Sequence, residues 1–359
     1  MLIEGPGSLS QLPAQLADRG VLRPMLISGN RSFAAARPLL NHWLSEGHIT
    51  HELKQGENVQ QQEILNALKR FRQAGCDGVI GIGGGSVMDL AGPVALLASV
   101  DDEERVTRIL AAKEDAECRS VALAQVPTTS GSGSEATRYA VTYHGSKKIT
   151  LTSPALLPDI AVLDPSLTLP LSDRQLAISG IDAISQAIEG WWSVAATDQA
   201  CTYSQDALKL LLPAIRQARS TSEENQRLDA HMAMLKGSYL AGCSINITKT
   251  TVPHALSYVL TSHFGVPHGQ AVSFWLPRAM LHIAGVTDAD CNDPRGAPAV
   301  QERLAGITAV FGMHAITDVA HAIVRLMKEL NLAVNLNDLQ VDRKRLLQLL
   351  NLFEHLTNL

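Results

Sequence analysis

The sequence lacks the features that mark nucleic-acid-binding and membrane proteins. It has 359 residues, a formal net charge of −5 at pH 7 and no run of lysine or arginine. Because binding to phosphates needs a basic stripe, a nucleic-acid partner is not expected. The longest apolar stretches, such as Pro93 to Val100, are far too short to span a bilayer, so no membrane partner is expected either.

Cysteines are also sparse, and no two of them form a Cys-X-X-Cys pair. An odd number of scattered cysteines favours free thiols in a reducing compartment. The first residues, MLIEGPGSLSQL, lack a basic segment followed by an apolar one, so no signal peptide is expected and the sequence predicts a cytoplasmic protein. The five cysteines are Cys76, Cys118, Cys201, Cys243 and Cys291.

Length and composition indicate a globular protein of two domains. Apolar residues make up 46% of the chain and charged residues 18%, as in ordinary folded enzymes. A chain of 359 residues is too long for one small core. We find no internal repeat and no low-complexity linker, so the domain boundary must come from the pattern of predicted elements.

The first half of the chain alternates short apolar runs with segments of helical periodicity, which predicts parallel βαβ units. Tyr139, Val141 and Tyr143 then alternate with other residues before a turn at His144-Gly145-Ser146, which predicts a β-hairpin between residues 138 and 152. The predicted strands are 23–29, 78–83, 120–126 and 160–164, and the predicted helices are 60–74 and 87–100.

From Ser172 onward the periodicity is helical throughout. This change of period predicts an α/β dinucleotide-binding domain over residues 1–170 and an all-helical domain over residues 171–359. The predicted helices are 172–193, 198–219, 222–243, 252–263, 271–284, 300–311, 317–331 and 342–355.

Two loops in the first half are candidates for binding a nucleotide. A glycine-rich turn follows one predicted strand, and a loop dense in hydroxyl groups follows the next. Loops at the carboxyl ends of adjacent parallel strands form a crevice, where backbone N–H groups and a helix N-terminus favour phosphate. The turn alone is equally compatible with a simple chain reversal. The candidate residues are Gly83, Gly84, Gly85, Ser86, Asp89, Thr128, Thr129, Ser132 and Ser134.

The second half carries a candidate metal site. Asp182 and Gln186 are four residues apart in a predicted helix and share one face. His254 opens a helical segment, and His268 is predicted to lie in a Pro-His-Gly loop. A carboxylate, two imidazoles and an amide oxygen suit Zn²⁺, Fe²⁺ or Mn²⁺ better than Ca²⁺. From the residues alone, lone surface histidines and a helix-capping role for Asp182 remain open.

Together these segments resemble the iron-containing (group III) alcohol dehydrogenase family. The resemblance implies a Rossmann-like N-terminal domain, an all-α C-terminal metal-binding domain as in the dehydroquinate-synthase-like fold, and hydride transfer in the cleft between them. A homodimer is also expected. The matching segments are GIGGGSVMDLAG from Gly81, PTTSGSGSEATRYAV from Pro127, SGIDAISQAIEGWWS from Ser179 and HALSYVLTSHFGVPHG from His254.

The family's metal ligands are an aspartate, a histidine four residues later and two histidines fourteen residues apart. Asp182, His254 and His268 match this pattern, but Gln186 stands in place of the second ligand. The resemblance therefore implies Fe²⁺ or Zn²⁺, with an amide oxygen as a weaker donor. Where the family often carries a further histidine near the nicotinamide, this chain has Tyr258, so Tyr258 or water is the expected proton donor.

The resemblance also bears on the cofactor. Many relatives end the first nucleotide strand with an aspartate that holds the adenosine ribose, whereas this chain has Gly29, Asn30 and Arg31 after Ser28. Because Arg31 can pair with a 2′-phosphate, NADPH is favoured over NADH. The family's lysine three residues after Asp89 is Gly92 here, which removes one expected contact with the pyrophosphate.

Within the family, residues 183–193 and 246–258 look most like phosphonoacetaldehyde reductases, which implies reduction of phosphonoacetaldehyde to 2-hydroxyethylphosphonate. Lys249, with Thr250, Thr251 and Arg138, is a candidate for binding the phosphonate dianion, although a solvated lysine fits the sequence equally well. His263 is a weaker candidate for proton donation than Tyr258.

Three other functions remain open at this point. The chain could be a general short-chain alcohol dehydrogenase of the same family. It could be a dehydroquinate-synthase-like lyase, although it lacks the density of lysine and arginine typical of those sites. With one ligand replaced, it could also be a degenerate nucleotide-binding protein.

Overall fold

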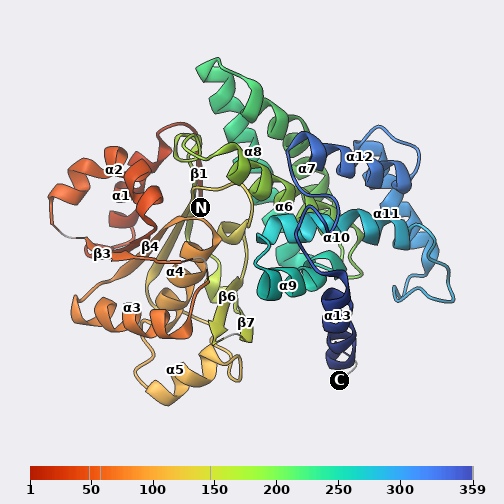
Figure 1. Ribbon diagram of the computed structural model, residues 1–359. Coiled ribbons are helices and arrows are strands. Elements are labelled where there is room, and N and C mark those ends of the chain that lie inside the picture. Colours follow the sequence, from red (N-terminus) through yellow and green to blue (C-terminus); the bar gives the residue numbers. More distant parts are fainter. Residues whose placement is uncertain (48, 57, 146, 358–359) are drawn as a thin grey trace.

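The computed structural model describes residues 1–47, 49–56, 58–145 and 147–357, with side chains up to residue 351. A sheet-containing half is followed along the chain by a helical half that lies beside it (Figure 1). This arrangement confirms the predicted fold class. No helix within the described residues is long and apolar enough to cross a membrane.

The first half is built on a six-stranded parallel sheet with the order β1-β8-β5-β4-β2-β3. Every residue of β2 and β4 is buried, as expected for strands that are covered on both faces. Because all strands run the same way, their carboxyl ends meet at one edge of the sheet. The strands are β1 (Leu2–Glu4), β2 (Pro24–Ser28), β3 (Thr50–Leu53), β4 (Gly78–Gly83), β5 (Ala122–Pro127) and β8 (Ile160–Leu163).

Alternate side chains of the strands enter two cores on opposite faces of the sheet. Met25 and Val79 belong to the core that includes α3 and α4, whereas Leu26 and Ile80 belong to the core that includes α1 and α2. Because successive side chains point to opposite faces and both faces are buried, every position in these strands favours an apolar residue. The strands therefore appear in the sequence as continuous apolar runs. The helices of this half are α1 (Leu12–Ala17), α2 (Asn30–Ser45), α3 (Gln61–Gln73), α4 (Gly85–Leu97) and α5 (Glu103–Leu110).

A two-stranded antiparallel hairpin, β6 (Tyr139–His144) and β7 (Lys147–Thr152), stands apart from the main sheet. The predicted hairpin is confirmed, although Ser146 of its predicted turn lies outside the described residues. The sequence did not predict β1, β3, α1, α2 or α5. The two strands are short, and β3 is only half-buried, so neither produces a strong apolar pattern.

The second half consists of helices joined by loops, as predicted. Three boundaries differ by three residues or more: α8 continues to Thr248 rather than Cys243, α10 begins at His268 rather than residue 271, and α11 begins at Ala297 rather than residue 300. Asp182 lies in the middle of α6, whose N-cap is Ser172, so Asp182 is not a helix cap. The helices are α6 (Asp173–Trp192), α7 (Asp198–Ser220), α8 (Glu224–Thr248), α9 (Val252–Phe264), α10 (His268–Ile283), α11 (Ala297–Val310), α12 (Ile316–Glu329) and α13 (Arg343–Thr357).

His268 is therefore helical, and its predicted place in a loop is wrong. Pro267 precedes the helix as its N-cap with φ −55° and ψ 139°, and Gly269 follows within the first turn. A Cβ on Gly269 would lie only 2.1 Å from the carbonyl oxygen of Ile178 and 3.0 Å from the Cβ of Asp182. The glycine that suggests a turn in the sequence instead lets the start of α10 touch the backbone of α6.

We expect Gly269→Ala to destabilise the protein by about 1–3 kcal/mol, because the added methyl forces the start of α10 away from α6. Denaturant unfolding measures the loss. Gly285→Ala is the matched control: it lies just beyond the same helix, and the nearest atom to an added Cβ is 3.9 Å away. Equal midpoints for the two variants would contradict the proposed close approach.

Candidate active site

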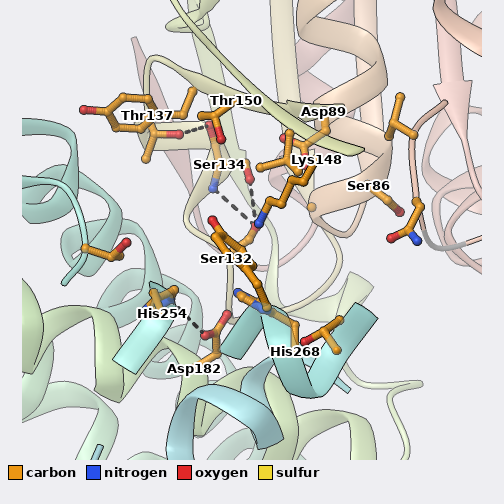
Figure 2. Close-up of a pocket in the computed structure, with 18 of the residues that line it drawn as sticks. Ser86, Asp89, Ser132, Ser134, Thr137, Lys148, Thr150, Asp182, His254 and His268 are labelled. Atoms are coloured by element: carbon orange, nitrogen blue, oxygen red, sulfur yellow. Dashed lines mark hydrogen bonds and ion pairs between the residues drawn. The ribbon is translucent and has the colours of Figure 1, made fainter. Parts of the chain in front are cut away.

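A cleft of about 910 Å³ lies between the two halves of the molecule. Its walls come from the start of α4, the loop after β5, the hairpin, and helices α6, α8, α9 and α10 (Figure 2). The cleft therefore brings together the two halves that the sequence assigned to nucleotide and metal. The predicted site residues that line it are Gly85, Ser86, Asp89, Ser132, Ser134, Asp182, Gln186, Lys249, His254, Tyr258 and His268.

The glycine-rich turn and the hydroxyl-rich loop pack directly against each other. Gly85 opens α4, and a Cβ at this position would lie 3.1 Å from the Cβ of Ser132. A Cβ on Gly84 would lie 3.4 Å from Oγ1 of Thr129. The backbone N–H of Thr128 donates to the carbonyl of Gly83 at 2.9 Å. Glycine is needed here because the two loops leave almost no space for a side chain, and the helix start stays open to a phosphate group.

The other predicted cofactor residues lie outside the described lining of the cleft. Gly29 is the N-cap of α2, with Asn30 and Arg31 exposed in its first turn at the carboxyl end of β2. Thr128 is buried, and its hydroxyl lies 3.2 Å from that of Ser32 on α2, which ties this helix to the hydroxyl-rich loop. These residues lie at the same edge of the sheet as the cleft, but they are not among the described residues that line it.

Gly92, which occupies the position of the family's lysine, is buried within α4. A Cβ at this residue would lie 3.1 Å from a methyl carbon of Leu156. The absence of a side chain at Gly92 therefore allows α4 to pack tightly against Leu156.

Three potential metal ligands converge at the floor of the cleft. One ligand atom from each of Asp182, His254 and His268 lies within 4.8 Å of the others. Oδ1 of Asp182 and Nε2 of His254 are 3.5 Å apart, and the two imidazole rings meet edge to face with centroids 5.4 Å apart. A tetrahedral ion with ligands at about 2.1 Å separates neighbouring ligand atoms by about 3.4 Å. The Asp182–His254 spacing suits such an ion.

Gln186 lies one turn after Asp182 on α6 and lines the same cleft. Its side-chain Nε2 donates a hydrogen bond to Oδ2 of Asp182 at 3.4 Å. This bond leaves Oε1 of Gln186 and Oδ1 of Asp182 available to bind another group. Among the described residues, these two oxygens and Nε2 of His254 are buried without a hydrogen-bond partner. Buried polar atoms without partners are costly, and a divalent cation would satisfy all three. The residues present thus fit a metal ion.

Glu189 is a candidate functional residue to which the sequence analysis assigned no role. It is fully buried on α6, and its Oε1 lies 2.5 Å from Nδ1 of His254. Its Oε2 accepts hydrogen bonds from the backbone N–H and the hydroxyl of Thr251. A carboxylate behind a histidine fixes the ring orientation and leaves Nε2 free for a metal. Its spacing of seven residues from Asp182 on one helix face was the available signal.

The electrostatics of the two histidines differ. Burial lowers the pKa of His254, but the carboxylates of Glu189 and Asp182 outweigh it and raise that pKa to about 10. Desolvation within the cleft lowers the pKa of His268 to about 4, despite the attraction of Asp182. A lowered pKa favours the neutral imidazole, whose lone pair can bind a metal ion. The carboxylates around His254 favour one positive charge, which a metal ion would supply in place of a proton.

Lys148 is a second residue that the sequence analysis missed. It extends from β7 into the cleft (Figure 2). Its Nζ lies 3.7 Å from the centre of the Tyr258 ring on α9. Asp89 lies nearby and is half-buried; desolvation raises its pKa to about 7, against the opposing effect of Lys148. The hairpin was predicted, but only the tertiary structure shows that one of its side chains reaches the other half of the molecule.

Lys249 lies at the mouth of the cleft with an unusual backbone conformation. It is the C-cap of α8, with φ 62° and ψ 174°, a region that is almost exclusive to glycine. Thr250 lines the cleft beside it, whereas Thr251 is bound to Glu189 and Arg138 is not among the described lining residues. His263 is exposed in the last turn of α9. Of the predicted anion-binding residues, the structure brings Lys249 and Thr250 to the cleft.

Comparison with known protein families agrees with this geometry. Residues 1–165 match the model described as iron-containing alcohol dehydrogenase, and residues 176–352 match the C-terminal model of the same family. The chain belongs to the iron-containing alcohol dehydrogenase family. The family and the oxidoreductase class predicted from the sequence are confirmed.

Two curated relatives are informative. Phosphonoacetaldehyde reductase of Streptomyces viridochromogenes is 33% identical over 250 residues, which cover 68% of this chain and 62% of that protein. Sulfoacetaldehyde reductase of Bilophila wadsworthia is 31% identical over segments that cover 96% of this chain and 88% of that protein. The names of both relatives describe reduction of a small aldehyde with an acidic group.

Solved structures share the whole fold. Sulfoacetaldehyde reductase of Bifidobacterium kashiwanohense, solved in complex with NAD⁺, superposes with a TM-score of 0.84 at 25% identity and covers 96% of this chain and 88% of that one. An iron-containing alcohol dehydrogenase of Thermococcus thioreducens superposes with a TM-score of 0.83 at 22% identity, covering 97% and 88%. The second likeness shows the fold alone.

We expect Gln186→His to raise the affinity for Zn²⁺ at least about tenfold, or ~1.4 kcal/mol, because an imidazole nitrogen is a better donor than an amide oxygen. Competition with a chelator measures the affinity. Gln199→His, which adds the same ring to the exposed surface of α7, is the control. An unchanged affinity in Gln186→His would show that this side chain does not face the ion.

Proposed function

We propose that the protein reduces a small aldehyde to the alcohol with a reduced nicotinamide cofactor and a divalent metal ion. The observation that carries the proposal is the convergence of Asp182, His254 and His268 within one cleft whose opposite wall is the glycine-rich turn. Family membership supports the reaction class, and the NAD⁺ complex of the Bifidobacterium structure supports the cofactor class.

Each part of the cleft has a role in this proposal. When bound, the metal would polarise the carbonyl and the nicotinamide would supply hydride. Asp182, Gln186, His254 and His268 would hold Fe²⁺ or Zn²⁺, with Glu189 orienting His254. The residues of the glycine-rich turn and the hydroxyl-rich loop would hold the dinucleotide, so that both reactants are positioned before reaction.

We propose phosphonoacetaldehyde as the substrate, reduced to 2-hydroxyethylphosphonate. The names of the two curated relatives support an aldehyde that carries a tetrahedral anion. Lys249 supports it from the structure, because a lysine held in a glycine-like conformation at the cleft mouth calls for a functional reason. A phosphonate there would pair with the ammonium while the aldehyde end points to the candidate metal site.

For the cofactor we propose NADPH. Arg31 is exposed in the first turn of α2, directly after β2, and no carboxylate occupies the Ser28-Gly29-Asn30 segment before it. A 2′-phosphate at this strand end would meet a guanidinium and a helix N-terminus rather than a negative charge. Rates measured with NADPH and NADH in the same assay test this choice.

His268→Ala should lower the rate of aldehyde reduction at least about 100-fold, because it removes a metal ligand and with it several kcal/mol of charge stabilisation. Steady-state rates with phosphonoacetaldehyde measure the effect, and circular dichroism and nucleotide binding check the fold. His263→Ala on the exposed end of α9 is the control and should retain the rate. A wild-type rate in His268→Ala would remove the proposed site.

Lys249→Ala should raise the KM for phosphonoacetaldehyde about tenfold or more, the equivalent of ~1.4 kcal/mol, and leave the KM for propanal nearly unchanged. Alanine keeps the strained backbone, so the comparison isolates the charge. Lys209→Ala, an exposed lysine on α7, is the control. Similar changes for both aldehydes would remove the phosphonate proposal while leaving aldehyde reduction intact.

A further inference from the structure

Lys148 and Tyr258 form a contact that joins the two halves of the molecule inside the cleft. Lys148 comes from the hairpin of the first half, and Tyr258 lies one turn after His254 on α9 of the second half. The lysine Nζ lies 3.7 Å from the ring centroid, well within the range of a cation–π interaction. Both side chains line the same cleft as the candidate metal ligands.

The groups around this pair come from three further parts of the cleft wall. Asp89 on α4 is half-buried, and both Asp89 and His268 on α10 experience the charge of Lys148. Tyr143 on β6 has a pKa raised by burial and by the neighbouring Tyr258 and Asp89. The lysine thus lies among acidic and phenolic groups, and its ammonium is placed against the ring of the tyrosine that is closest in sequence to a candidate metal ligand.

Building on the proposed function, we propose that Tyr258 donates the proton that completes aldehyde reduction and that Lys148 is its positioning residue. Hydride adds two electrons to the carbonyl carbon. The Oη–H bond of Tyr258 breaks as an O–H bond forms on the former carbonyl oxygen, which gives the alcohol. The phenolate then takes a proton from solvent in the cleft, so that atoms and charge balance.

Electrostatics explains why the lysine matters in this step. An ammonium against the ring attracts a neutral phenol weakly and a phenolate strongly, so it stabilises the tyrosine in the state that follows proton donation. Because Lys148 belongs to a two-stranded hairpin and Tyr258 to a helix, the pair also fixes the ring relative to the substrate site.

The experiment compares Tyr258→Phe, Lys148→Met and Lys148→Arg with the wild-type holoenzyme. We expect kcat to fall about 100-fold in Tyr258→Phe and about tenfold in Lys148→Met, within the range of general acid catalysis. Lys148→Arg should recover most of the loss. Lys147→Met, at the exposed neighbouring position on the same strand, is the matched control and should keep the wild-type kcat.

Isotope effects separate proton donation from a merely structural role. In Lys148→Met the solvent deuterium effect on kcat should grow, because proton donation becomes slower, and the effect of deuterium at the nicotinamide should shrink. A wild-type kcat in Tyr258→Phe would overturn the proposal in favour of water as donor. A higher KM for NADPH at unchanged kcat in Lys148→Met would also overturn it. An inactive wild type would instead remove the proposed function itself.

Discussion

The close approach of α6, α9 and α10 is the constraint on which the candidate site depends. Gly269 lets the start of α10 touch the backbone of α6, and this contact brings His268 beside Asp182. Glu189 then holds His254 from behind. Two buried carboxylates near each other are unfavourable unless positive charge lies between them, so the packing of these helices builds in a demand for a cation.

A second backbone contact joins the hydroxyl-rich loop of the first half to the second half. Gly133, with φ 60°, packs so tightly on α8 that an added Cβ would lie 2.7 Å from the Cα of Gly242. The hydroxyl-rich loop after β5 is therefore fastened to the helix that ends at Lys249. Hydride transfer tolerates little error in distance, and a direct contact between backbones allows little relative movement of the two halves.

Local sequence patterns were sufficient to predict most helices and strands, but not the tertiary contacts between them. Helical spacing placed Asp182 and Gln186 on one face, and the alternation of strands and helices gave the parallel sheet. The Pro-His-Gly segment was assigned to a loop because proline and glycine usually interrupt helices, whereas here the glycine serves the contact with α6. Lys148 gave no local signal, because its role depends on a hairpin reaching across the cleft to a helix more than a hundred residues later.

The two departures from the family pattern, Gln186 and Tyr258, change the chemistry of the cleft in the same direction. Each replaces an imidazole by an oxygen-bearing side chain. Gln186 holds Asp182 through its amide nitrogen and presents a neutral oxygen, so it adds no charge to the floor of the cleft. At Tyr258 a positive charge lies against the ring, from Lys148 on the opposite half. The cation, Lys148, and the hydroxyl group, Tyr258, are therefore separate residues on separate halves of the molecule. The candidate site is complete only when the two halves are together.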